Sequence, residues 1–586
     1  MPKRIKLGCN FADTLSVGSG RARGSLVPSP LDDDNRHAER VLYFFGLCLV
    51  GLVVLVGRLV YLSIFNNEKY RNLSDNNRIR QEIIRAPRGM ILDRNNLKLT
   101  QNVPVYRLEV RSKDGQVSGY KTIKEEEALS LQARGLPVIA DPGRTYPQAG
   151  VFSHVLGFIG EISAESLKKP DNKFELGDMV GQGGLEQQYD ILLRGKNGRR
   201  MYETDTAEKI VRILGEEQPI PGVDLHTSLD SGLQQAAMTA LAEKDGAVVV
   251  LEASTGAVLA LASSPTFDPN LFTSGAIANQ ATIEEILKNP EAPLINRTIG
   301  GVYPAGSTFK IVVTAAALVE KKIPLEYTFD DPGFITAGTQ RFYNWAFSQH
   351  GKREGVIDAS QALARSTDTF FYTIGALVGP EGMTNWSEKF RFGQTSGIDL
   401  PGEMAGLIPT PEWKQKVKGE RWYLGNTYNM SIGQGDVLVT PLQVAQMTQV
   451  VANNGWICTP RIAATHRYSC QNLNIPDEVL RVIKKGMIGA CSPGGTSFPL
   501  FNFSPPVACK SGTAQYGVKG KLTHAWLTAY APADVPQVVV TVLVEGGGEG
   551  SAVAAPLVKD ILNVYFRNSD KVGLATPSAH ASETFP

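Results

Sequence analysis

The longest apolar run in the chain lies near its start. Residues 41–57 read VLYFFGLCLVGLVVLVG without a charged side chain, and LVYLSIF continues the run after Arg58. Together they make roughly 25 residues, and a helix needs about 20 to cross a bilayer. No small-x-small cleavage site follows, which argues against a cleaved signal peptide. The pattern predicts one transmembrane helix over residues 41–65.

Polar and small residues dominate both ends of the chain. Residues 1–40 are rich in Ser, Gly, Asp and Arg, and residues 568–586 read NSDKVGLATPSAHASETFP. Neither end has enough apolar side chains to bury, so both are predicted to be disordered tails. Basic residues flank the apolar run on both sides, so the positive-inside rule does not decide its orientation. We expect the N-terminal tail in the cytoplasm and the long remainder outside.

Short strand and helix patterns follow the apolar run. Residues 85–96 (RAPRGMILDRNN) alternate like a strand that ends at an Asn-Asn turn. Residues 181–200 have the pattern of an amphipathic helix that stops at Gly195–Gly198. A capped helix is predicted in TSLDSGLQQAAMTAL, with Asp230 or Ser231 at its N-cap. Its apolar residues share one face: Leu233, Ala236, Ala237 and Leu241. This helix marks the entry to a second domain.

The second domain begins and ends with strand patterns. Residues 246–263 (GAVVVLEASTGAVLALAS) predict two apolar strands around a Ser-Thr-Gly turn. Near the other end, HAWLTAYAP and QVVVTVLVE read as strands, and AVAAPLVKDILNVYF reads as a helix. Helical segments lie between the two ends. The pattern therefore predicts one sheet, assembled from both ends of the domain and covered by helices.

Composition narrows the possible functions. A chain of 586 residues with 42% hydrophobic content exceeds one core, so we expect at least two domains. A net charge of +1 gives no field that would attract nucleic acid. Seven histidines form no zinc-binding pattern, and we expect no metal. The six cysteines are dispersed, so we expect free thiols, although the pair Cys458 and Cys470 could bond in an oxidising compartment.

The stretch YPAGSTFK contains a candidate nucleophile. Ser307 and Lys310 lie three positions apart at a predicted helix start, which places them one turn apart on one face. Serine needs a neighbouring base to react, and a helix N-terminus favours developing negative charge. A first-turn serine with a solvated lysine would explain this motif equally well on its own. A P-loop would need lysine directly after Gly306, where Ser307 stands, so nucleotide binding is excluded.

Two further motifs follow in order. Ser366-Thr367-Asp368 comes about sixty residues later, and Lys510-Ser511-Gly512 with Thr513 comes near the end. Each motif alone is common, but the three in this order are hard to explain by chance. Lys510 offers a cation for a carboxylate, and Gly512 is expected to let a substrate backbone approach the strand.

These residues resemble the penicillin-binding proteins, the serine D,D-transpeptidases of peptidoglycan synthesis, whose site combines S-x-x-K, S-x-N or S-x-D, and K-[ST]-G. The resemblance extends from about residue 41 to 566 and includes RGMILDR, GGLEQQYD, PLINRTIGGVYPAGSTFK, SIGQGDVLVTPLQVA and KSGTAQ. The membrane span leads into a pedestal, and no glycosyltransferase domain precedes it, which is typical of class B members. The S-x-D triplet, KSGTAQ and HAWLTAYAP favour the elongation-specific penicillin-binding protein 2 over the septal enzyme.

The resemblance implies an α/β (α+β) serine transpeptidase fold, also found in β-lactamases, with a central antiparallel sheet flanked by helices. A single transmembrane helix and an elongated, mainly β pedestal would precede it. The expected segments are a cytoplasmic tail (1–40), the membrane helix (41–65), the pedestal (66–235), the transpeptidase domain (236–567) and a tail (568–586). The pedestal is short between residues 110 and 144, so the contacts that a larger head subdomain makes with activating partners are in doubt.

The resemblance also implies a mechanism. Ser307 would attack the carbonyl of a D-Ala-D-Ala stem peptide and form an acyl-enzyme, and β-lactams would acylate the same serine. Lys310 would take the serine proton and Ser366 would relay it. Asp368 would raise the pKa of Lys310, and a nearby Lys510 would lower it. Backbone N–H groups of Ser307 and Thr513 would form the oxyanion hole. The residues expected to bind substrate are Asp368, Lys510, Ser511, Gly512 and Thr513.

Other activities share parts of this pattern. A β-lactamase or D,D-carboxypeptidase has the three motifs but does not usually carry the RGMILDR pedestal. A septal transpeptidase, a β-lactam sensor and a silent scaffold are the remaining alternatives. A class B enzyme makes no glycan strands, so the resemblance implies a glycosyltransferase partner of the shape, elongation, division and sporulation family. It implies no cofactor.

Overall fold

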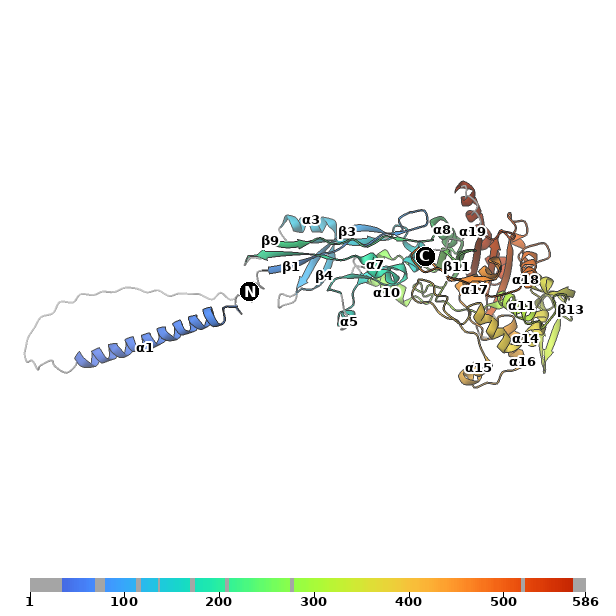
Figure 1. The fold of residues 1–586 in the computed structure, drawn as a ribbon, viewed down its shortest axis with the longest axis horizontal. Helices are drawn as coiled ribbons and strands as arrows, with labels where there is room; N and C mark the ends of the chain where they lie inside the picture. Colours follow the sequence, from blue (N-terminus) through green and yellow to red (C-terminus); the bar gives the residue numbers. More distant parts are fainter. Residues whose placement is uncertain are drawn as a thin grey trace, which may run out of the picture. The chain divides into compact units, whose positions relative to one another are not determined.

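The computed structural model divides the chain into two units. Figure 1 labels their helices and strands. One unit holds residues 1–81 and 201–215, and the other holds residues 82–200 and 216–586. The structure describes residues 34–68, 79–111, 117–134, 138–168, 174–205, 210–273, 279–517 and 522–572.

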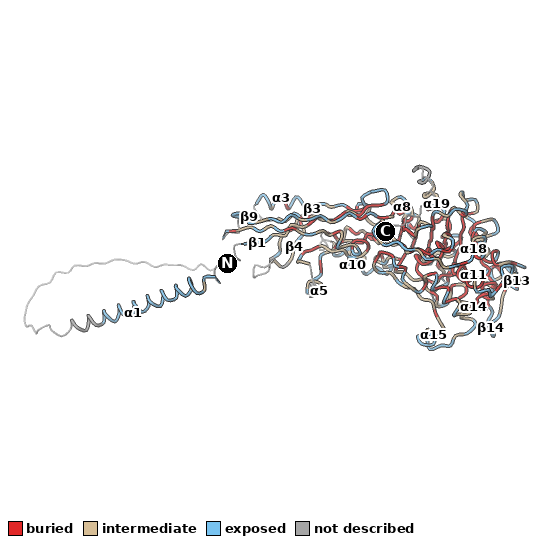
Figure 2. The backbone as a smooth tube through the Cα atoms, viewed as in Figure 1, coloured by how far each residue is buried: buried red, intermediate tan, exposed pale blue. Residues whose placement is uncertain are grey.

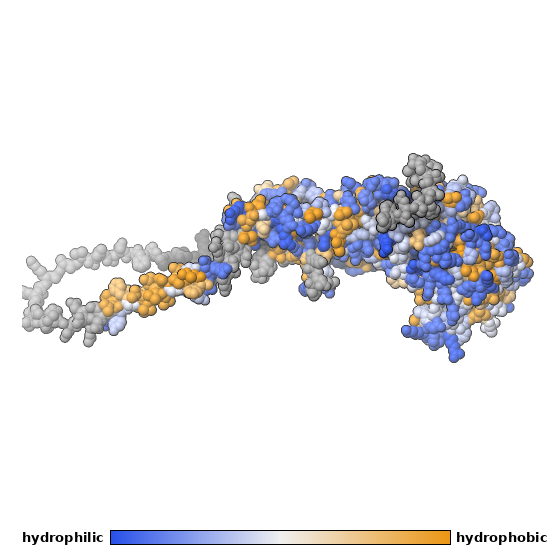
Figure 3. All heavy atoms as spheres, in the orientation of Figure 1, coloured by the Kyte–Doolittle hydropathy of each residue, from blue (hydrophilic) through white to orange (hydrophobic). Residues whose placement is uncertain are grey.

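The first unit contains the predicted membrane helix. Helix α1 (Asp34–Val60) continues into a π-helical turn, η1 (Tyr61–Phe65). Among the described residues, Arg40–Phe65 is the one helix long and apolar enough to cross a membrane. Its large apolar side chains are exposed and form a continuous hydrophobic surface (Figure 3), which a bilayer would cover. The helix is confirmed.

The tail predictions need correction at both ends. Residues 34–40 are helical rather than disordered, because adding residues to an existing helix costs much less than starting one. For the same reason α19 (Gly550–Val572) continues past position 567. The remaining predicted tail residues, 1–33 and 573–586, lie outside the described residues.

Strands dominate the segment between the membrane helix and α8 (Ser231–Ala240), as the resemblance implied. One sheet has the order β4-β3-β5, from β3 (Gln101–Arg111), β4 (Val117–Ile123) and β5 (Ile139–Thr145). Another has the order β1-β8-β9, from β1 (Ile79–Ile84), β8 (Gly198–Thr204) and β9 (Ile210–Glu217). The shorter elements here are α3 (Glu125–Ala133), η2 (Ala149–Val151), α4 (Ser153–Leu156), β6 (Ile159–Glu161), α5 (Ala164–Leu167) and β7 (Met179–Gly181).

Two sequence patterns in this segment are shorter than predicted. Of residues 85–96, only β2 (Ile91–Leu92) forms a strand, and it pairs in parallel with β10 (Leu225–His226). Residues 181–200 contain two helices, α6 (Gly184–Gln188) and α7 (Asp190–Arg194), rather than one. The break falls at Tyr189, whose hydroxyl donates to Asp399 Oδ2 at 2.8 Å, a tertiary contact that local periodicity does not reveal. The second helix ends at Gly195, as predicted.

A buried ion-pair network holds the RGMILDR segment to α6. Glu186 is fully buried, with Oε1 2.7 Å from Arg144 Nε and Oε2 2.8 Å from Arg88 Nη2. Burial alone would raise the pKa of Glu186, but the two guanidinium groups outweigh it and lower that pKa below its ordinary value. Arg88 also lies 2.9 Å from Asp190 of α7. The network therefore fixes both short helices to β5 and to the segment just before β2.

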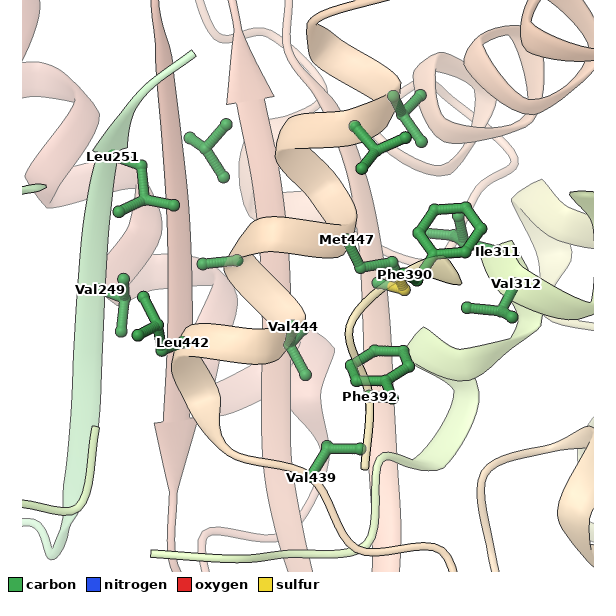
Figure 4. Close-up of a cluster of buried hydrophobic side chains, with 14 of the residues drawn as sticks. Val249, Leu251, Ile311, Val312, Phe390, Phe392, Val439, Leu442, Val444 and Met447 are labelled. Atoms are coloured by element: carbon green, nitrogen blue, oxygen red, sulfur yellow. The ribbon is translucent and has the colours of Figure 1, made fainter. Parts of the chain in front are cut away.

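The second domain is built on one antiparallel sheet with the strand order β12-β11-β21-β20-β19, as predicted from the two ends of the domain. Its strands are β11 (Gly246–Glu252), β12 (Val258–Ser264), β19 (Ala508–Tyr516), β20 (Leu522–Ala531) and β21 (Val538–Val544). In Figure 4 the green β11 lies beside strands from the red end of the sequence. The entry helix α8 is confirmed, and its N-cap Asp230 accepts hydrogen bonds from Gly232 N and Leu233 N.

Most residues of the five strands are buried (Figure 2), so both faces of the sheet are covered. Alternate residues of β11 point to opposite faces. Val248 and Val250 share one core with α8 and α19, whereas Val249 and Leu251 belong to the other. There they pack near α17 (Pro441–Ala452), all of whose residues are buried (Figure 4). The helix α11 (Lys310–Val319) belongs to the same core as Val249 and Leu251, so its N-terminus is held firmly in place.

Further elements surround this frame. The helices are α9 (Asn270–Thr273), α10 (Gln280–Lys288), η3 (Gly306–Phe309), α12 (Trp345–His350), α13 (Ala359–Arg365), α14 (Asp368–Lys389), α15 (Pro411–Lys418), α16 (Leu424–Ser431), α18 (Asp477–Ala490) and η4 (Phe498–Leu500). The short strand pairs are β13 (Thr328–Asp331) with β16 (Gly355–Asp358), β14 (Phe334–Ala337) with β15 (Gln340–Tyr343), and β17 (Trp456–Cys458) with β18 (Cys470–Asn472).

Four cysteines form disulfides, so the expectation of free thiols is wrong for them. Cys458 bonds to Cys470 across β17 and β18, and Cys491 bonds to Cys509 between the end of α18 and β19. The fold brings the paired Cα atoms to 4.0 and 5.9 Å, a proximity that spacing along the chain does not reveal. Cys48 is free and exposed, and Cys9 lies outside the described residues.

Candidate active site

The candidate nucleophile lies on a tight turn that leads into a buried helix. Ser307 belongs to the 3-10 turn η3, and Lys310 is the first residue of α11. In a 3-10 turn, side chains three positions apart are nearly eclipsed, so those of Ser307 and Lys310 share one side. Lys310 is fully buried, whereas Ser307 is partly exposed. The turn therefore presents a hydroxyl near the surface and a lysine beneath it.

Lys310 reaches the second motif. Its Nζ donates to Ser366 O at 2.8 Å, to Ser366 Oγ at 3.1 Å and to Asp368 Oδ1 at 2.6 Å. Ser366 is the C-cap of α13 and has φ +57, a left-handed conformation that is strained for a residue with a side chain. Asp368 begins α14, where the helix dipole favours a negative charge. The short link between the two helices thus aims both polar groups at Lys310.

The third motif meets the second at the same hydroxyl. Lys510 lies on β19, at the edge of the sheet, and its Nζ donates to Ser366 Oγ at 3.0 Å and to Ser511 O at 2.8 Å. Ser366 Oγ therefore contacts the amines of both lysines. The structure brings together Lys310, Ser366, Asp368 and Lys510 by hydrogen bonds.

Burial sets the charge of the two lysines. It lowers the pKa of Lys310 below its ordinary value, although the Asp368 carboxylate opposes this. It lowers the pKa of Lys510 well below its ordinary value, and the neighbouring Lys310 ammonium adds to the effect while Asp368 opposes it. Because the carboxylate contacts Lys310, this lysine holds its proton more strongly than Lys510. The expected effect of Asp368 is present, but it does not overcome burial.

The remaining predicted residues lie along β19. Strand alternation places Ser511 and Thr513 on the face opposite Lys510. Ser511 Oγ lies 2.8 Å from Thr496 Oγ1, and Thr513 Oγ1 accepts a hydrogen bond from Gly550 N at 3.4 Å.

Gly512 packs closely against neighbouring segments of the protein. A Cβ there would lie 3.1 Å from Trp526 Cβ and 3.2 Å from Thr308 Cγ2. The space beside its Cα is therefore filled by the protein itself, and the glycine allows β19 to pack closely on η3.

The SIGQGD segment, to which the sequence assigned no role in the site, supports the turn that carries Ser307. Gly433 O accepts a hydrogen bond from Gly306 N at 2.8 Å, and Gln434 Nε2 donates to Thr513 O at 3.4 Å. Gly433 has φ +67, and a Cβ there would lie 2.3 Å from Gly306 O. The G-x-G spacing was the available signal, but only the fold shows which turn it contacts.

Two residues outside the three motifs, Asn344 and Trp345, hold Asp368 in place. Trp345 N donates to Asp368 Oδ2 at 3.1 Å, and Asp368 N donates to Asn344 Oδ1 at 3.3 Å. Asn344 Nδ2 in turn donates to the buried Asp331 at 2.9 Å. These residues have no motif around them, so sequence reasoning could not have found them. Among the described residues, no group of three or more His, Cys, Asp or Glu side chains could hold a metal ion.

Two family models match this chain. The penicillin binding protein transpeptidase domain matches residues 246–563, and the penicillin-binding protein dimerisation domain matches residues 116–227. The peptidoglycan D,D-transpeptidase MrdA of Acinetobacter baumannii is 32% identical, over 91% of this chain and 88% of that protein. MrdA of Escherichia coli K12 is 31% identical, over 89% of this chain and 92% of that protein.

Solved structures agree with these matches. Penicillin-binding protein 2 of Helicobacter pylori, in complex with MreC, has a TM-score of 0.74 at 28% identity, covering 83% of this chain and 99% of that chain. Penicillin-binding protein 2 of Pseudomonas aeruginosa, in complex with WCK 5153, has a TM-score of 0.67 at 32% identity, covering 83% and 96%. A structure described as a peptidoglycan synthase complex that coordinates polymerization and crosslinking has a TM-score of 0.72 at 30% identity, covering 91% and 98%.

Gly433→Ala should destabilise the protein more than Gly435→Ala. Both positions have positive φ, +67 and +75, so each alanine costs roughly 1–2 kcal/mol of backbone strain. At Gly433 the new Cβ also meets Gly306 O at 2.3 Å, whereas at Gly435 the nearest atom is Asn429 Cβ at 3.4 Å. The clash should add about 1–3 kcal/mol. Thermal unfolding of the two purified variants measures the difference, and equal melting temperatures would show that this contact does not support the turn.

Proposed function

Because this chain belongs to the penicillin-binding proteins, in the MrdA (penicillin-binding protein 2) branch, we propose that Ser307 is the nucleophile of its transpeptidase reaction. The protein is a peptidoglycan D,D-transpeptidase that acts in cell-wall elongation. The observation that carries the assignment of residues is the bonding of Ser366 Oγ to both buried lysines, of which Lys310 lies one turn from Ser307. In domain terms, residues 66–235 form the pedestal and residues 236–567 the transpeptidase domain, in keeping with the ranges of the two family models.

Substrate binding prepares the base. The terminal carboxylate of the stem peptide binds near Lys510, Ser511 and Thr513, and its negative charge favours the protonated form of Lys510. A proton then passes from Lys310 to Ser366 Oγ, while the Ser366 proton moves to Lys510. Ser366 Oγ lies 3.1 Å from one amine and 3.0 Å from the other, which suits this relay. Lys310 becomes neutral next to Ser307.

Acylation follows from this state. Neutral Lys310 takes the proton of Ser307 as Oγ attacks the carbonyl carbon of the D-Ala-D-Ala bond. The backbone N–H groups of Ser307 and Thr513 stabilise the oxyanion, an effect worth about 3–4 kcal/mol per donor in acyl transfer. The proton on Lys310 then passes through Ser366 to the departing amine, and D-alanine leaves. An amine of a neighbouring strand attacks the acyl-enzyme and returns its proton by the same route.

Ser307→Ala should abolish covalent labelling by a fluorescent penicillin, because the bond to the carbonyl carbon cannot form. Ser166→Ala is the matched control, since Ser166 begins the unrelated S-x-x-K sequence SLKK. Gel fluorescence of membranes that contain either variant measures the label. Full labelling of Ser307→Ala would refute the assignment of the nucleophile.

Asp368→Asn should shift the pH profile of acylation, so that the rate rises at a lower pH than in the unmodified protein. Burial lowers the pKa of Lys310 and Asp368 partly restores it, so removing the carboxylate lowers that pKa further. The neutral base is then available at lower pH. Glu381→Gln, which alters an exposed acid beyond the kink of α14 at Gly379, should leave the profile unchanged. The second-order rate of penicillin acylation across pH measures the shift, and movement to higher pH would contradict a base role for Lys310.

The membrane arrangement belongs to the same proposal. The N-terminus lies in the cytoplasm, and the catalytic domain lies outside the inner membrane. Two disulfides in the catalytic domain suit that side, because disulfides persist in oxidising compartments. The chain acts on peptidoglycan together with other proteins of the cell-wall machinery. We assign as its partner a glycosyltransferase of the shape, elongation, division and sporulation family, since the similar synthase complex couples polymerization to crosslinking.

Co-purification tests the partner. The full chain, solubilised from membranes in mild detergent, should retain an elongation-type polymerase of that family and not the division-type one. Ser307→Ala should retain it equally, because the association does not depend on acylation. Preferential recovery of the division-type polymerase would overturn the assignment.

A further inference from the structure

A loop at the end of α18 lies between the second and third motifs in the sequence. α18 packs closely on α13, the helix that ends at Ser366. A Cβ at Gly486 would lie 2.8 Å from Leu363 Cβ, and one at Gly489 would lie 2.9 Å from Ala364 Cβ. Residues 491–497, called the 491–497 loop below, follow directly and reach β19. The loop is therefore placed by the same helix pair that places Ser366.

The 491–497 loop is fixed at several points. Cys491 is bonded to Cys509, the residue before Lys510. Ser497 N donates to Ala490 O at 2.9 Å, which closes the loop onto the end of the helix. At Gly495 a Cβ would lie 2.2 Å from Gly489 O, so only glycine fits there. Thr496, between these anchors, has little freedom to move.

Thr496 contacts a residue of the third motif. Its Oγ1 lies 2.8 Å from Ser511 Oγ, and either oxygen can be the donor. The Ser511 side chain is 8% exposed, whereas Thr496 is more open to solvent. Each hydroxyl has a single proton. When the Ser511 hydroxyl donates a hydrogen bond to a substrate carboxylate, its oxygen can accept a hydrogen bond from Thr496. Two hydrogen bonds in such a chain strengthen each other.

We propose that Thr496 is a positioning residue of the carboxylate site. Its hydroxyl donates to Ser511 Oγ and so directs the Ser511 proton toward the carboxylate of a stem peptide or of a penicillin. The inference rests on the proposed role of Ser511 in holding that carboxylate. No bond is made or broken by Thr496 itself.

The test compares a fluorescent penicillin with its methyl ester, which lacks the carboxylate. Thr496→Val removes the hydroxyl and keeps the shape, so the acylation rate with the acid should fall about three- to tenfold. The rate with the ester should not change. Thr496→Ser should restore the rate with the acid. Ser492→Ala is the matched control, because that hydroxyl lies in the same loop but donates to Ile488 O.

The outcomes separate this inference from the function on which it rests. Ser511→Ala should reduce the acid-to-ester rate ratio; if it does not, the carboxylate role of Ser511 fails and the inference fails with it. If Ser511→Ala reduces the ratio and Thr496→Val does not, the inference alone is overturned. Equal losses with acid and ester in Thr496→Val would show a purely structural role and also overturn it. Thr496→Ala provides the same comparison if the valine variant does not fold.

Discussion

Two lysine amines buried around one serine hydroxyl are the constraint on which the site depends. Removing a charged amine from water costs several kcal/mol unless partners compensate, and here two amines are buried close together. Asp368 and the carbonyl of Ser366 serve Lys310, and the carbonyl of Ser511 serves Lys510. The left-handed backbone of Ser366 follows from this arrangement, since its carbonyl and its hydroxyl both face Lys310.

The surrounding architecture holds three distant segments at this point. A wholly buried helix begins with one lysine, the edge strand of the sheet carries the other, and the link between α13 and α14 supplies the serine. Close approaches at glycines join these pieces, as at Gly433 against the nucleophile turn and at Gly512 against Thr308. The strained geometry of the site is thus sustained by rigid packing on both faces of the sheet.

Local signals predicted part of this structure well. The N-cap of α8, the two apolar strands of residues 246–263 and the helix start before Ser307 depend on neighbouring residues, and all were found from the sequence. The resemblance supplied the motif residues, but their hydrogen bonds came only with the fold. Features that depend on distant partners were missed: the disulfides, the break at Tyr189, and the contacts of Asn344 and Thr496. The close packing beside Gly512 was missed as well, because the atoms that it contacts come from other segments.

The pairing of β11 with β21 joins the beginning of the catalytic domain to its end. Strands formed early in synthesis therefore wait for their central neighbour until nearly the whole chain has left the ribosome. Pairing between such distant segments is slow, because a long loop must close before any contact rewards it. Until then β11 and β12 present an unpaired apolar edge, which favours association with other chains. The order in which the sheet closes thus completes the site only when nearly the whole chain has been made, and leaves the emerging chain dependent on protection until then.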